Sequence, residues 1–431
     1  FYLKMLEGEV RYYRTHPNAV PSHPNMDDTE KVLETAKWDQ GAPYNNLTPK
    51  QGSSHCVTGC VATAMAIVMR YHNWPDAGVG TIPEYTTPSG IKVPAIELGY
   101  AYDWSNMLME YKSGRWSEAE GNAVARLMAD CGAAVQMQYT ADGSGAFSVR
   151  VAPALTTYFK YDQSAQYITR KTCSKAQWIQ LIHNDIDNGR PLIYGAQSTS
   201  GGGHEFVGAG YRGSDYVYIN FGWGGSSNGF YYVTTMDSFS QSVDAIFNIK
   251  PDAGGSPVKE YRLGLNENLQ CSAYVSGKAT SITATVINTG NTVFSGKLGA
   301  IIKTPGNKLR EKDVASKSVS IKGQDDIYYY PYTATYEISS STIIKAGESV
   351  QMYYQPFGSQ KWTELPYYEE DVTGIVYPAG QKEDFMNYVK LSYSRTSRIL
   401  SIILPYNDTV DNTGEEEHLY AFRYAHTWKK K

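Results

Sequence analysis

His55–Pro75 reads HCVTGCVATAMAIVMRYHNWP, and this stretch decides the fold of the first half of the chain. After Gly59 comes an apolar, alanine-rich run, Val61–Tyr71, with no glycine or proline inside it. Such a run predicts a largely buried helix. Cys60 then lies in the first turn, where unpaired backbone N–H groups and the helix dipole favour thiolate over thiol. This position suits a nucleophilic sulfur, although most free cysteines are inert packing residues.

A second segment, Ser200–Tyr211 (SGGGHEFVGAGY), places a histidine at the start of a predicted strand. His204 follows three glycines, so its imidazole is expected at the lip of a sheet with little side-chain bulk beside it. The next strand ends at Asn220 and is followed by FGWGG, and the hairpin brings Asn220 and Trp223 near His204. Cysteine first, histidine much later, then an Asn/Trp cluster is the order expected of a papain-type peptidase.

These motifs, together with Trp38–Asn45 (WDQGAPYN), resemble the streptopain family of secreted bacterial cysteine peptidases. The resemblance covers residues 38–250. It implies a papain-like fold, with Cys60 as the nucleophile and His204 as the general base. It also implies a secreted or cell-surface bacterial protein that acts on protein or peptide substrates without a cofactor.

The resemblance further implies a zymogen, inhibited by an upstream pro-segment or by a separate protein inhibitor. The chain starts at Phe1 without an initiator methionine or a signal peptide. We therefore expect an N-terminal piece to have been removed or to lie outside this sequence.

The mechanism implied by the resemblance is acyl transfer from a thiolate–imidazolium pair, in which the cysteine pKa falls to about 3–4. The oxyanion would be met by the Cys60 N–H and the Gln40 amide. Gln40 lies twenty positions before Cys60, so the loop between them must fold out of the way. Gln51 is the alternative donor, and spacing does not separate the two.

Asn220 is predicted to orient the imidazole of His204, with Trp223 shielding that hydrogen bond from water. Phe221 stands where the family carries a tryptophan, so an indole N–H is absent from that position. The predicted substrate-binding residues are Ser144, Gly145, Gly203 and Phe221.

A chain of 431 residues predicts two domains. We assign residues 1–37 to an N-terminal extension or pro-segment remnant, 38–252 to a papain-like peptidase domain and 258–431 to a β-rich accessory domain. Capping boxes at Ser117 and Ser174 predict helix starts in the peptidase domain. The predicted class is α+β, a papain-like domain followed by an all-β, immunoglobulin-like sandwich.

The junction DAGGSP, residues 252–257, is linker-like. We expect the β-rich domain to fold separately, to supply no catalytic group and to be removable near Gly255 with little effect on kcat. The alternatives are that it packs over the cleft or acts as an inhibitor.

The composition limits the partners. A net charge of −4 without an internal Lys/Arg cluster argues against nucleic acid and anionic membranes as partners, and no apolar run reaches membrane-spanning length.

No metal site is predicted, because no second Cys/His cluster has zinc-ligand spacing. Five cysteines are too few for a disulfide framework, so we expect the others to be buried and unpaired. The acidic runs Glu369–Asp371 and Glu415–Glu417 are expected to be solvated charge.

Two other functions fit the sequence. One is a catalytically silent papain-like adhesion module, which Phe221 and the large β-rich domain permit but the intact Cys60 and His204 oppose. The other is a transglutaminase-like acyl transferase, which shares the Cys/His chemistry and differs in its acceptor.

Overall fold

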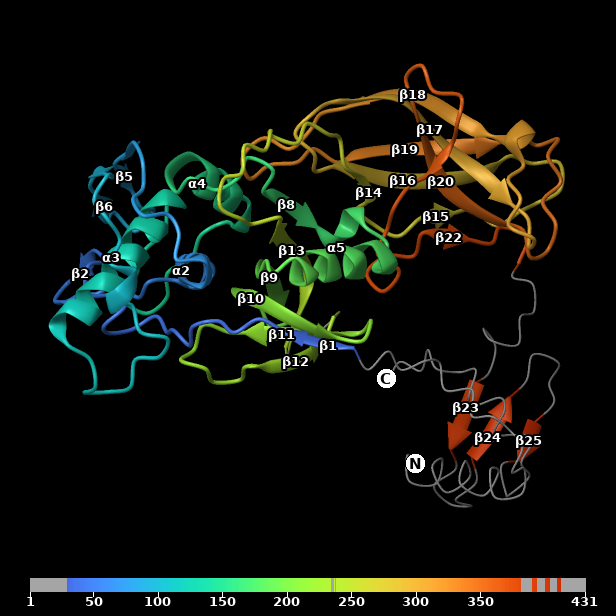
Figure 1. Ribbon diagram of the computed structural model, residues 1–431. Coiled ribbons are helices and arrows are strands. Elements are labelled where there is room, and N and C mark those ends of the chain that lie inside the picture. Colours follow the sequence, from blue (N-terminus) through green and yellow to red (C-terminus); the bar gives the residue numbers. More distant parts are fainter. Residues whose placement is uncertain are drawn as a thin grey trace.

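The computed structural model describes residues 29–233, 236 and 238–380. It also gives the backbone of three short paired strands, β23 (Lys390–Tyr393), β24 (Leu400–Ile403) and β25 (Thr409–Asp411). The chain is of mixed α/β class: its described α-helices lie between residues 60 and 187, and strands dominate the described residues after 257 (Figure 1). Residues 1–28 and the acidic run Glu415–Glu417 lie outside the described residues.

The predicted buried helix is α2 (Cys60–His72), and its residues Val61–Met69 are all buried. Gly59 precedes it with φ +83°, and a Cβ there would lie 2.6 Å from the Met137 sulfur, so glycine is required at this turn. The capping boxes are also confirmed, because they begin α3 (Glu118–Ala134) and α5 (Lys175–Asp187).

A seven-stranded antiparallel sheet forms the centre of the first half, in the order β12-β11-β10-β9-β13-β8. The seventh strand, β1, pairs with the end of β10 beyond the residues that β9 pairs with. Residues 30–32, predicted as part of an extension, therefore belong to this sheet. The strands are β1 (Glu30–Val32), β8 (Gln166–Thr169), β9 (Leu192–Ser198), β10 (Gly203–Arg212), β11 (Tyr216–Asn220), β12 (Gly229–Tyr232) and β13 (Phe239–Phe247).

Helices cover both faces of this sheet. Ile193 and Val207 point into the core that contains α2, α3 and α4 (Val151–Tyr158). Their neighbours Leu192 and Phe206 point into the core that contains α5. The period of two in the strands therefore divides the first half into two cores.

Small elements border the helical core. Three two-residue hairpin or bridge pairs are formed by β2 (Lys50–Gln51) with β3 (Ser54–His55), β4 (Thr81–Ile82) with β7 (Ile96–Glu97), and β5 (Tyr85–Thr86) with β6 (Lys92–Val93). The described 3-10 turns are η1 (Trp104–Asn106), η2 (Ser148–Arg150), η3 (Arg170–Thr172) and η4 (Glu311–Asp313).

The second half contains two antiparallel sheets that share one apolar core. In the first sheet, β16 pairs with all the other strands. In the second sheet, β17 and β20 pair with each other at the centre. The first sheet consists of β14 (Leu263–Leu265), β15 (Gln270–Cys271), β16 (Thr280–Asn288) and β19 (Tyr332–Ile338). The second consists of β17 (Phe294–Lys303), β18 (Ala315–Ile321), β20 (Ser349–Pro356), β21 (Thr363–Glu364) and β22 (Ile375–Val376).

The two halves are joined by buried contacts. Tyr368, from the segment after β21, is fully buried in the core that contains α5. Arg170 is 1% exposed, lies over the Tyr368 ring at 4.4 Å and pairs with Asp371 at 2.5 Å. Lys175 pairs with Glu370 at 3.2 Å. The prediction that the acidic run Glu369–Asp371 is solvated charge is wrong, because Glu370 and Asp371 pair with cations of the first half.

All five cysteines are free, and Cys56, Cys131 and Cys173 are buried, as expected. Cys60 is partly exposed, and so is Cys271, for which the expectation of burial is wrong. None of the helices described is both long and apolar enough to cross a bilayer.

Candidate active site

Cys60 and His204 line one cavity of about 490 Å³. Cys60 stands at the start of α2, and His204 is the second residue of β10. The backbone N–H of Glu205, the residue after His204, acts to lower the pKa of the Cys60 thiol. The fold thus brings together two residues that are 144 positions apart in the sequence.

One hydrogen bond fixes the tautomer of His204. Its Nε2 lies 2.7 Å from the carbonyl oxygen of Phe221. A carbonyl oxygen only accepts, so Nε2 carries the proton and Nδ1 has the free lone pair. His204 is thereby arranged as a base.

Aromatic rings surround the imidazole of His204. The ring centroids of Trp223, Phe206 and Phe239 lie 4.8, 4.9 and 5.8 Å from it. Burial lowers the pKa of His204, and the hydrogen bond to the Phe221 carbonyl acts in the opposite direction. Burial therefore favours the neutral form of the imidazole.

The pKa of the Cys60 thiol is shifted as well. Burial raises its pKa to about 11, and the charge of Glu205 contributes to this rise. The N–H groups of Glu205, Val61 and Cys60 itself act in the opposite direction but are outweighed. Burial of both residues thus opposes their charged forms, and the thiolate–imidazolium pair stays a prediction.

Asn220 does not contact His204 through its side chain. The buried amide donates to Thr35 Oγ1 at 3.0 Å and to the Ala36 carbonyl at 2.9 Å, and its Oδ1 accepts from Gly222 N at 3.1 Å. Asn220 thus holds the 220–222 turn against residues 35–36. The group that orients His204 is the Phe221 carbonyl, which the sequence does not single out because backbone atoms carry no residue signature.

The two glutamine candidates differ in position. The carbonyl of Gln40 accepts from Thr58 N at 3.1 Å, two residues before Cys60, so the intervening loop does fold away. The side chain of Gln51 instead accepts from Ala141 N at 2.8 Å, on an exposed hairpin. Gln40 is therefore the candidate that the chain brings beside Cys60.

Three of the four predicted substrate-binding residues line the cavity: Ser144, Gly145 and Gly203. Gly145 exchanges both backbone hydrogen bonds with Gln138, so it offers its bare α-carbon and not free backbone groups. Phe221 is the exception. Its ring is 1% exposed and does not line the cavity, so we assign it to positioning His204 and not to binding substrate.

Sequence reasoning missed two acidic residues that line the same cavity, Glu205 and Asp244. Each is a single charge inside an apolar strand, HEFVGAG and SVDAIF. A buried strand that carries one carboxylate is a signal in its own right, because an unpaired charge is costly to bury.

The β-rich half also reaches this cavity. Gln324, Ile327 and Tyr329, from the loop between β18 and β19, are among its lining residues. These contacts favour the alternative in which this half packs over the cleft, and the expected small effect of truncation near Gly255 on kcat stays a prediction.

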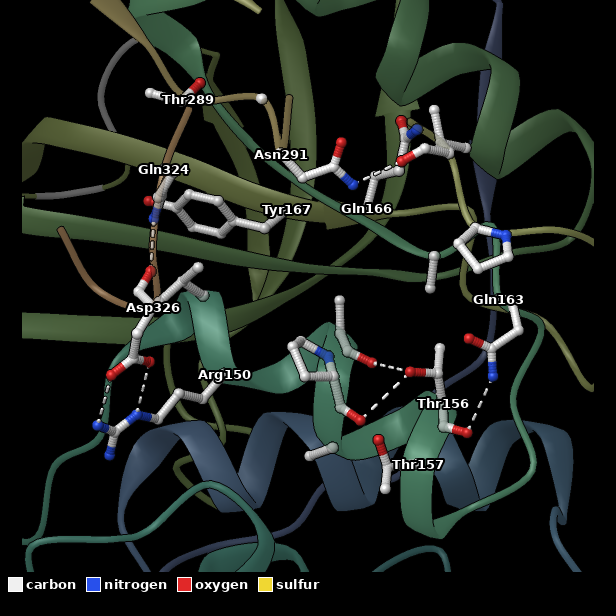
Figure 2. A pocket seen from close by; sticks show the side chains of 18 of the residues that line it. Arg150, Thr156, Thr157, Gln163, Gln166, Tyr167, Thr289, Asn291, Gln324 and Asp326 are labelled. Carbon is white, nitrogen blue, oxygen red and sulfur yellow. Dashed lines mark hydrogen bonds and ion pairs between the residues drawn. The ribbon is translucent and has the colours of Figure 1, made fainter. Parts of the chain in front are cut away.

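A second cavity, of about 710 Å³, lies at the interface between the two halves (Figure 2). Arg150 and Asp326 pair across it at 3.3 Å. Tyr167 and Gln324 border both cavities. The lining of the larger cavity includes neither Cys60 nor His204, so we assign no chemistry to it.

The chain resembles known peptidases in three comparisons. Residues 38–231 match the Peptidase C10 family. Streptopain of Streptococcus pyogenes is 35% identical over 243 residues, which are 50% of this chain and 60% of streptopain. Thiol protease/hemagglutinin PrtT of Porphyromonas gingivalis is 28% identical over 377 residues, which are 83% of this chain and 42% of PrtT.

Among solved structures, the interpain A cysteine protease of Prevotella intermedia is 37% identical and covers 53% of this chain and 98% of its own, with a TM-score of 0.47. The match covers less than two thirds of the length of streptopain and of PrtT. The resemblance to the streptopain family is confirmed.

Proposed function

We propose that this chain, whose residues 38–231 belong to the Peptidase C10 family, is a secreted bacterial cysteine endopeptidase. The observation that carries the proposal is the pairing of Cys60 with a histidine of fixed tautomer in one cavity. Its substrates are proteins or peptides, and an upstream pro-segment or a separate inhibitor would keep it inactive. No cofactor takes part.

The chemistry follows from the tautomer of His204. Nδ1 removes the Cys60 proton as the sulfur attacks the peptide carbonyl, and the imidazolium that forms is stabilised by the Phe221 carbonyl. The tetrahedral oxyanion is met by the Cys60 N–H and the Gln40 amide. His204 then protonates the leaving amine, and water releases the acyl group by the reverse sequence.

We further propose a papain-like fold for the first half and an immunoglobulin-like fold for the second. A helix that starts at Cys60 against an antiparallel sheet that starts at His204 supports a papain-like peptidase domain. Two antiparallel sheets around one core support an immunoglobulin-like sandwich for the second half.

Hydrolysis of denatured casein, with and without a thiol-directed epoxide, tests the proposal. We expect hydrolysis that the epoxide abolishes, with one equivalent bound to Cys60. Addition of a primary amine separates the transglutaminase-like alternative, because a transferase would incorporate the amine. Binding of protein without cleavage would favour the adhesion module and overturn the proposal.

A further inference from the structure

Two carboxylates near Cys60, those of Glu205 and Asp244, lie on either side of a glycine, Gly195. Gly195 on β9 is the cross-strand partner of Glu205 on β10 and of Asp244 on β13. A Cβ on Gly195 would lie 2.6 Å from Asp244 Oδ1, 2.8 Å from Glu205 Oε2 and 3.0 Å from Ser148 Oγ. Three oxygen atoms from three elements therefore converge above one bare α-carbon.

Half of the carboxylate oxygens in this group have a donor. Ser148 donates to Glu205 Oε2 at 2.7 Å, and Tyr167 donates to Asp244 Oδ2 at 3.1 Å. Glu205 Oε1 and Asp244 Oδ1 are buried without a hydrogen-bond partner. Glu205 is only 4% exposed, so its free oxygen is not satisfied by bulk water. Such oxygens are costly unless a donor reaches them.

The cations near the cavity are engaged elsewhere. Lys171 donates to Asn266 at 3.0 Å, and Arg150 pairs with Asp326 at 3.3 Å. Within the described ranges no ion pair reaches Glu205 or Asp244. The missing donor is therefore expected from a ligand that enters the cavity.

From this geometry we propose that Glu205 and Asp244 form a subsite for a positively charged side chain, arginine or lysine, of the peptide substrate. The inference rests on the proposed peptidase function, because the same cavity holds Cys60 and His204. A guanidinium has five N–H donors and an ammonium has three, which is enough to reach both free oxygens.

The electrostatics of the pair support a cationic ligand. Burial raises the pKa of Glu205, and the charge of Asp244 raises it further. Burial likewise raises the pKa of Asp244. Since two neighbouring carboxylates resist being ionised together, the empty pair retains a proton, which a bound cation would displace to solvent. The same cation would offset the charge of Glu205 that opposes the Cys60 thiolate.

A substrate side chain fits this group better than a metal ion. Two carboxylates and one hydroxyl are fewer protein ligands than calcium usually takes. Among the described residues, no group of three or more His, Cys, Asp or Glu is placed to hold a metal.

Binding without turnover tests the subsite directly. Peptides that differ only by arginine or citrulline, at each of three positions on either side of the scissile bond, are titrated into Cys60→Ala protein in EDTA. At one position we expect arginine to bind at least about tenfold tighter than citrulline. Adding Glu205→Gln and Asp244→Asn should reduce this ratio to below about threefold.

A matched control is Asp130→Asn in the Cys60→Ala background. Asp130 is a buried carboxylate of α3 that accepts from Tyr100 and Tyr102 at 2.6 and 2.9 Å, and it does not line the cavity. This variant should keep the arginine/citrulline ratio. A ratio that also collapses here would reflect general destabilisation and would overturn the assignment.

The kcat/KM ratio of the same peptides with the wild-type enzyme provides the second arm. Hydrolysis with no preference for arginine at any position overturns the subsite, and the pair would then be a structural one that shares a proton. Selective binding by the Cys60→Ala protein without hydrolysis by the wild type would overturn the peptidase function and leave the subsite standing. A preference that needs added calcium in place of EDTA would assign the group to a metal and overturn the proposal.

Discussion

At the scale of single residues, the chemistry depends on where one proton of His204 resides. The Phe221 carbonyl holds the proton on Nε2 and leaves Nδ1 basic. In the proposed mechanism this imidazole is a general base, and proton transfer to it accompanies attack by the sulfur.

The raised pKa of Cys60 predicts the pH dependence of alkylation. Only the thiolate reacts, and the pKa of Cys60 is raised to about 11 by burial and by Glu205, so the iodoacetamide rate should climb steadily from pH 6 to 10. Glu205→Gln removes the charge that opposes the thiolate once Glu205 is ionised, so it should raise the rate at the alkaline end of this range. A wild-type rate that is level from pH 5 to 8 would instead indicate a preformed thiolate–imidazolium pair.

Gln40 gives the second residue-scale prediction. Gln40→Ala should lower kcat by about 10- to 1000-fold with little change in KM, because one oxyanion donor is lost. Gln51→Ala is the matched control, since its amide is bound to Ala141 on an exposed hairpin. Steady-state kinetics on a short peptide decide between them, and a larger loss in Gln51→Ala would reverse the assignment.

Residue-level prediction from sequence succeeded where a pattern has a local cause. Cys60 follows a glycine and begins an apolar helix, and His204 follows three glycines, so both positions are visible in the sequence. Glu205 and Asp244 lie 39 positions apart and meet only because both strands pair with β9 at Gly195. That register is a tertiary property, and no local pattern contains it.

At the scale of elements, the turn after β11 positions the base. Asn220→Ala would remove three hydrogen bonds that hold this turn to residues 35–36 and to Gly222. We expect kcat to fall more than KM rises. The Phe221 hydrogen bond raises the pKa of His204, so its weakening should move the acid limb of kcat/KM to lower pH.

Two comparisons check that Asn220→Ala acts through position and not through unfolding. Near-UV circular dichroism should remain that of the wild type, and Asn73→Ala, at the exposed end of α2, should leave the pH profile unchanged. An Asn220→Ala profile with an unshifted acid limb would contradict the positioning role.

Element boundaries followed from sequence where side chains terminate them. The capping boxes at Ser117 and Ser174 each accept from the N–H three residues on, which is why α3 and α5 begin where predicted. β1 was not predicted, because the short segment Glu30–Val32, with two charged residues, becomes a strand only through pairing with β10.

At the scale of the whole molecule, the two halves are packed together. Asp371 compensates the charge of Arg170, which is 1% exposed in the first half. Asp371→Ala would remove the carboxylate that compensates this buried charge, at a cost of about 3–5 kcal/mol in the free energy of unfolding. Urea unfolding measures this, and we expect both halves to lose stability together.

Asp325→Ala is the control for the contact between the halves, because its partner Lys322 is exposed and on the same loop. Exposed ion pairs contribute little, so this variant should unfold at nearly the wild-type urea concentration. Equal and small effects of Asp371→Ala and Asp325→Ala would show that the halves are independent, as the linker-like sequence 252–257 first indicates.

The central claim is that Cys60 performs the hydrolysis, and one pair of variants tests it most directly. Cys60→Ala and Cys56→Ala each remove one sulfur, four residues apart, and Cys56 is buried in the core and does not line the cavity. We predict that folded Cys60→Ala has no measurable activity on denatured casein, while Cys56→Ala retains most of it. Hydrolysis by Cys60→Ala at the wild-type rate would contradict the claim.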